Sequence, residues 1–108
     1  MDSILTSIKK DLGIAEEYIH YDSDIIRHIN SVFMILRQLG VGPSKAFRIT
    51  DKYDLWTEFL DTDELEAVKT YMYMKVKLIF DPPTSSAALE AMKESIKEYE
   101  FRLNVAAD

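Results

Sequence analysis

The 108-residue sequence contains no cysteine. This absence excludes disulfide bonds, a thiolate nucleophile and a zinc site built on cysteine ligands. The sequence also lacks an apolar run of the roughly 18 residues that a transmembrane helix needs. Its first residues, MDSILTSIKK, lack the basic-then-apolar order of a signal peptide. We therefore expect a protein that is made in the cytoplasm and has no membrane partner.

Basic residues are outnumbered, because 13 Lys and Arg stand against 19 Asp and Glu, which gives a formal net charge of −6. A protein that coats DNA needs lysine and arginine to displace counterions from the phosphates. The charge therefore argues against a protein that coats DNA. It is compatible with a protein that surrounds DNA without binding it tightly. The charge is spread fairly evenly, with no acidic tail and no basic arm.

Glycine and proline occur only three times each, and they follow periodic apolar segments. This placement is typical of helix ends, where Gly comes just after the last turn and Pro lies beyond it. Apolar residues at helical spacing predict four helices. The predicted helices cover residues 2–12, 23–39, 63–80 and 84–106.

Residues 40–63 form a long connection without a long periodic element, and such loops are often functional. Within it, residues 47–50 alternate apolar and polar side chains and could be a short extended piece. The length suits a single domain over residues 1–108. We predict an all-α fold, a small bundle of about four helices with one long irregular loop.

Motifs for catalysis or ligand binding are missing. The two histidines, His20 and His28, fit no HxxxH, HExxH or EF-hand pattern. There is no GxxxxGK[ST] and no GxGxxG, and no serine lies in a GxSxG elbow. We therefore expect no enzyme activity, no cofactor and no metal site.

Large apolar side chains are unusually dense in the third predicted helix and in the connection over 40–63. Four of them are consecutive in the third predicted helix, in the run YMYM at 71–74. Successive helical side chains turn by about 100°, so these four cannot share one face. One interpretation is a fully wrapped helix in a small core, and the other is a subunit interface, where Tyr, Trp and Met are enriched. The candidate interface residues are Phe47, Ile49, Trp56, Phe59, Tyr71 and Tyr73.

Four stretches of the sequence resemble one protein family, both in their residues and in the order in which they occur. They are LTSIKKDLGI at 5–14, the helix from Asp24 that ends in LGVGP at 39–43, the segment from Val68 that ends in FDPP at 80–83, and EFRLN at 100–104. Together they resemble the head–tail connector proteins of tailed bacteriophages and prophages. The resemblance covers almost the whole chain, and the LGVGP turn and the double proline are its most specific parts.

The resemblance implies a structural virion protein without catalytic residues. Such proteins form a ring, of about twelve subunits, beneath the portal at the capsid vertex. The implied partners are further copies of the chain, the portal protein and a further connector or tail protein. Double-stranded DNA would pass through the channel without specific binding. The implied location is the head–tail junction of the virion, after synthesis in the host bacterial cytoplasm.

The alternative is a small helical regulator that binds a protein or DNA as a dimer. A helix-turn-helix needs two helices joined by a turn of about three or four residues, and a basic second helix. Here the connection over 40–63 is too long, and the helix over 23–39 carries only Arg27 and Arg37. The state of the protein in solution separates the two hypotheses, because a regulator is a dimer at all concentrations.

Overall fold

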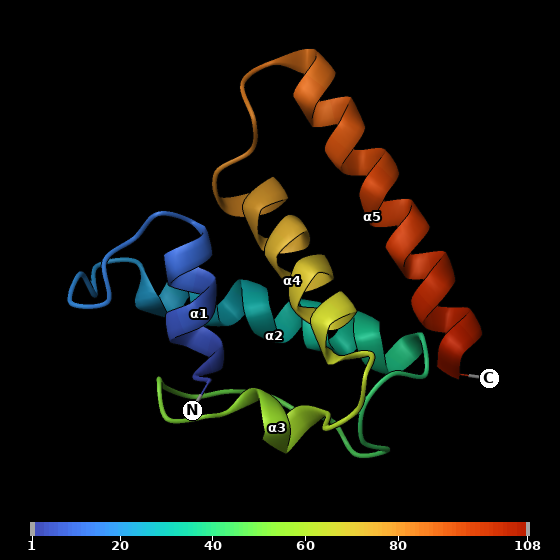
Figure 1. The fold of residues 1–108 in the computed structure, drawn as a ribbon. Helices are drawn as coiled ribbons and strands as arrows, with labels where there is room; N and C mark the ends of the chain where they lie inside the picture. Colours follow the sequence, from blue (N-terminus) through green and yellow to red (C-terminus); the bar gives the residue numbers. More distant parts are fainter. Residues whose placement is uncertain (1, 108) are drawn as a thin grey trace.

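The computed structural model describes residues 2–107 and contains five helices in this range (Figure 1). They are α1 (Ile4–Asp11), α2 (Asp22–Gln38), α3 (Trp56–Phe59), α4 (Leu65–Phe80) and α5 (Ser86–Ala107). No strand occurs in the described range, where the one strand-like pairing is an isolated bridge between Ser3 and Leu55. The predicted all-α fold with four main helices and a long connection is therefore confirmed.

The ends of the helices follow the local sequence. Ser3 caps α1, because its Oγ accepts a hydrogen bond from the N–H of Thr6 at 3.1 Å. Gly40 follows the end of α2 with φ of 86°, a conformation that favours glycine. The predicted bounds of the four long helices differ from the observed ones by no more than two residues, as is usual where helix ends fray.

The fourth helix, α4, lies between α5 on one side and α1 with α2 on the other (Figure 1). Its buried side chains are spread around the helix axis: Val68, Tyr71, Met72, Met74 and Val76. This spread corresponds to the interpretation of a helix that is wrapped on several sides. By contrast, α5 buries only Ile96 and Leu103 fully, because it packs mainly against α4.

The connection between α2 and α3 is attached to the core by an amide side chain. Asn30 of α2 accepts a hydrogen bond from the Ile49 N–H at 2.8 Å and donates one to the Ile49 carbonyl at 3.0 Å. A neighbouring strand would otherwise satisfy these backbone groups. The extended piece expected at 47–50 therefore forms no strand. Asn30 itself is half-buried.

Aromatic rings anchor the same connection. The ring of Phe33 on α2 lies 4.6 Å from that of Phe59 and 5.0 Å from that of Phe47, between centroids. Gly42 lies against Phe59 with φ of 93°, and a Cβ at this glycine would overlap the ring. The long connection is thus anchored to α2 at Phe47 and Ile49.

A buried lysine holds the loop between α1 and α2. Lys9 is only 2% exposed, and its Nζ donates to the carbonyl oxygens of Glu16 at 3.0 Å and Tyr18 at 2.8 Å. The Oδ1 atom of Asp22, at the start of α2, lies 2.8 Å from the same Nζ. A charged side chain is rarely buried without such partners. Lys9 therefore ties the loop to both helices.

Candidate docking surfaces

The candidate interface residues divide into two environments. Three of them are 0% exposed, namely Ile49, Trp56 and Tyr71, and Phe59 is 5% exposed. The single chain already covers these four side chains, as the interpretation of a fully wrapped core expects, so they do not lie on its outer surface. Phe47 and Tyr73 are half-buried. A contact with a neighbouring subunit stays a prediction for these last two.

Trp56 and Tyr71 are buried with their polar atoms satisfied. Trp56 Nε1 donates to Ser7 Oγ at 2.8 Å, which joins α3 to α1. The Tyr71 hydroxyl donates to Glu100 Oε2 at 2.7 Å, which joins α4 to α5. Burial and then the Glu100 carboxylate hold the pKa of Tyr71 well above its ordinary value. Both side chains therefore connect elements within one chain.

Tyr73 lies in a polar depression between α1 and α4. Lys10 and Lys69 line the depression beside it. The Nζ atom of Lys69 donates to Asp2 Oδ2 at 2.6 Å, and this hydrogen bond lowers the pKa of the Asp2 carboxyl and raises that of Lys69. The surroundings of Tyr73 are thus charged and solvated, and they form no apolar face.

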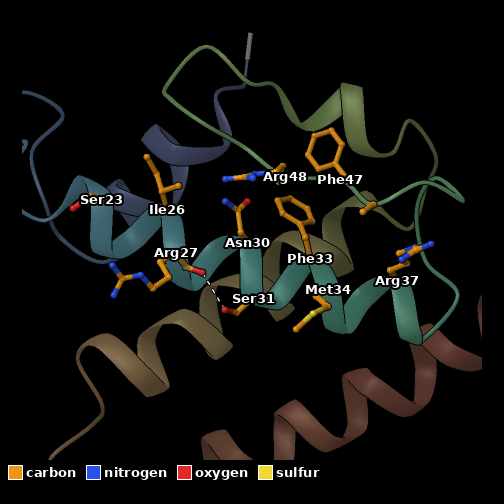
Figure 2. A pocket seen from close by; sticks show the side chains of 11 residues that line it. Ser23, Ile26, Arg27, Asn30, Ser31, Phe33, Met34, Arg37, Phe47 and Arg48 are labelled. Carbon is orange, nitrogen blue, oxygen red and sulfur yellow. Dashed lines mark hydrogen bonds between the residues drawn. The ribbon is translucent and has the colours of Figure 1, made fainter.

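A groove of about 610 Å³ runs along the outer face of α2 (Figure 2). Three of the four arginines in the sequence line it, and no acidic side chain does. Apolar side chains lie between the arginines, and one of them, Met34, is 60% exposed. We call it the arginine groove and define it by Arg27, Arg37 and Arg48 together with Met34 and Phe47.

The charges of the arginine groove are not neutralised within the described chain. None of its three arginines forms an ion pair across residues 2–107. Arg37 Nε donates to the Ser44 carbonyl at 3.2 Å, whereas the fourth arginine, Arg102, pairs with Glu98 at 2.9 Å. Figure 2 shows the three spread along α2, with Arg27 and Arg37 toward opposite ends and Arg48 coming from the connection. The groove is therefore a positive surface on an acidic protein.

Negative charge is concentrated in another segment, residues 51–66. This acidic segment contains seven Asp and Glu residues and one basic residue, Lys52, so its formal charge is −6. The rest of the chain is therefore neutral overall. The expectation that charge is spread fairly evenly is therefore wrong for this segment. Lys45 and Arg48 lie just before it and offset its charge over any longer stretch of sequence.

The acidic segment begins with a well-defined turn. Asp54 Oδ2 accepts from the N–H of Thr50 at 2.8 Å, and Asp51 Oδ1 accepts from the N–H of Tyr53 at 2.8 Å. Such Asx contacts hold a turn in one conformation. The Tyr53 side chain at its tip is 74% exposed. We call residues 50–54 the Tyr53 turn.

Among residues 2–107, no group of three or more His, Asp or Glu side chains stands close enough to hold a metal ion. Over the same residues, no helix combines the length and the apolar character that crossing a membrane requires.

Comparison with protein-family models gives a match over almost the whole chain. The model described as phage connector protein matches residues 4–108. The search of curated proteins and the search of solved structures give no significant match. The matched range includes both the arginine groove and the acidic segment.

Proposed function

Because the chain belongs to the phage connector protein family, we propose that it is a head–tail connector subunit that forms a ring below the portal. Family membership makes the protein a structural component of the phage particle. The match over residues 4–108 is the observation that carries the proposal. In this role the ring extends the DNA channel and provides a docking platform for further connector or tail proteins.

The distribution of charge supports a ring. Head-to-tail association needs two different surfaces on each subunit, which meet when the copies are related by rotation. The arginine groove and the acidic segment are two such surfaces, because they carry opposite charges and no residue of the acidic segment lines the groove. A two-fold dimer, in contrast, pairs one patch with itself.

The overall charge is compatible with a channel through which DNA moves. Tight, sequence-independent DNA binding depends on many contacts between Lys or Arg and phosphates. A subunit with a net charge of −6 repels phosphates on average, so DNA can pass without being held. We propose no specific DNA contact for this protein.

Electron microscopy of the concentrated protein, alone and mixed with the portal protein of the same phage or prophage, tests the proposal. We expect closed rings with a central opening, either free or stacked on the portal. Light scattering should show a monomer at low concentration that assembles as concentration rises, or one large closed oligomer. A dimer at every concentration that does not bind the portal would contradict the proposal and favour the regulator.

Deleting the gene tests the same proposal inside the particle. A connector is needed after DNA packaging to join the head to the tail. We expect lysates of the deletion to contain heads and free tails that are not joined, and a copy of the gene supplied from a plasmid should restore complete particles. Complete and infective particles without the protein would refute the assignment.

A further inference from the structure

We propose that the arginine groove of one copy binds the Tyr53 turn of a second copy, so that subunits join head to tail. The inference rests on the proposed ring and names the two surfaces that form it. Four observations carry it: the charge of the groove, the charge of the acidic segment, the exposed tyrosine and the rigidity of the turn.

The two surfaces are electrostatically complementary. The groove presents Arg27, Arg37 and Arg48 without a paired carboxylate among the described residues. The Tyr53 turn carries Asp51 and Asp54 with Lys52 between them, and it opens a segment whose formal charge is −6. Opposite charges on two patches accelerate encounter and exclude wrong orientations. A second copy of the chain therefore supplies the charge that the groove lacks.

The apolar parts of the two surfaces also fit. Tyr53 is 74% exposed, which gives a neighbouring copy an aromatic side chain to bury. The groove offers the exposed Met34 and the half-buried Phe47 between its arginines. Tyrosine and arginine are the residue types that most often dominate the energy of an interface, and arginine stacks on aromatic rings.

The Tyr53 turn is already in one conformation before it binds. The side chains of Asp51 and Asp54 accept backbone hydrogen bonds from within the turn. A preorganised segment loses little conformational entropy on association. None of the residues 50–54 lines the groove of the same chain. Each copy therefore keeps one groove and one turn available for two different neighbours, as a ring requires.

The composition of the groove favours a protein occupant over a nucleic acid. A phosphate backbone would contact the arginines, but it offers no apolar group to Met34 or Phe47. Protein domains that bind nucleic acid are usually basic as a whole, whereas this chain is acidic. Binding of duplex DNA in the groove would therefore overturn the proposal.

Two variants disable the two surfaces separately. Tyr53→Ala removes the aromatic side chain from the turn, and the double variant Arg27→Glu with Arg48→Glu reverses the charge of the groove. All three side chains are exposed, so folding should be preserved. The matched controls are Tyr18→Ala, which removes another exposed tyrosine, and Lys97→Glu with Arg102→Glu, which makes the same change of net charge on α5.

Sedimentation velocity of the full chain measures the effect. We expect Tyr53→Ala and the groove variant each to raise the concentration needed for assembly by about 10-fold or more, as interface hot spots do. The controls should assemble within about 2-fold of the unaltered protein. Raising the salt concentration should weaken assembly of the unaltered protein, because part of the attraction is between charges.

Mixing the two disabled variants gives a sharper test. Tyr53→Ala retains a working groove, and the groove variant retains a working turn. One intact interface can therefore form between them, and the mixture should contain one-to-one dimers but no rings. An interface that pairs one patch with itself predicts no such complementation. Absence of the mixed dimer would overturn the proposal.

The remaining outcomes separate this inference from the proposed function. Rings that form equally well from Tyr53→Ala or from the groove variant would overturn the inference and leave the connector role intact. A chain that stays monomeric at all concentrations and does not bind the portal would overturn both. Binding of a labelled DNA duplex, lost in the groove variant while ring assembly is unchanged, would show that the groove serves nucleic acid.

Discussion

Replacing Lys9 with methionine should destabilise the chain strongly, although methionine has a similar length and fills the space of the aliphatic part of lysine. The Lys9 ammonium group is buried, and it is the common partner of the Glu16 and Tyr18 carbonyls and of the Asp22 carboxylate. Methionine fills the space but donates no hydrogen bond. The loop between α1 and α2 would then lose its attachment at its centre and at its end.

The size of this loss in stability depends on how well water can hydrate the former partners of Lys9 in the variant. Removing one member of a fully buried ion pair costs about 3–5 kcal/mol. Here the Asp22 side chain is 26% exposed, and Glu16 and Tyr18 lie in an exposed loop, so part of the loss is recovered by hydration. We therefore expect a loss of about 2–3 kcal/mol in the free energy of unfolding. This corresponds to a fall of roughly 10–20 °C in Tm for a domain of this size.

Urea denaturation followed by far-UV circular dichroism and by the fluorescence of the single tryptophan measures the loss. Lys10→Met is the matched control, because Lys10 is exposed in the same helical turn, and its effect should stay within about 0.5 kcal/mol. Asp22→Asn completes a double-mutant cycle, in which we expect a coupling of about 1 kcal/mol or more with Lys9. Equal effects of Lys9→Met and Lys10→Met would refute the reasoning.

Two further variants test the core around the aromatic side chains. Trp56→Ala should cost about 3–5 kcal/mol in the monomer, because the indole is fully buried and bonded to Ser7; a loss below about 1 kcal/mol in urea denaturation would contradict its burial. Tyr71→Phe tests the raised pKa of the tyrosine. Because folding raises this pKa above its ordinary value of 10, the stability that the neutral hydroxyl provides is complete below pH 10 and is lost as pH rises further. Between pH 10 and 11 the unaltered protein should therefore lose up to about 1.4 kcal/mol more than Tyr71→Phe, and identical alkaline slopes for the two proteins would show that the hydroxyl does not titrate in this way.

The helices could be predicted from the sequence because their signals are local. Apolar spacing of three and four residues marks the buried face of a helix, and the glycines and prolines mark its ends. Both signals lie within a few residues of the structure that they describe. The order of these segments also carried the resemblance to connector proteins, which the family match over residues 4–108 confirms.

The environment of the aromatic residues could not be predicted in the same way. Whether Trp56 is covered depends on Ser7, which lies 49 positions away, and Tyr71 depends on Glu100, 29 positions away. Spacing along one helix does not reveal which other elements approach it. A dense aromatic pattern is therefore compatible with a core as well as with an interface, and here the single chain buries four of the six residues that were proposed for an interface.

The sequence by itself determined the fold class, the helix bounds and the family, because each depends on neighbouring residues or on their order. Only the tertiary structure decided which charges from separate elements lie together on the surface. It places Arg48, from an irregular connection, beside Arg27 and Arg37 of α2, and it places Lys9 where it is shielded from water. The physical reason is that electrostatic surfaces and burial depend on distances in space, which side chains far apart in the sequence acquire only when the chain packs.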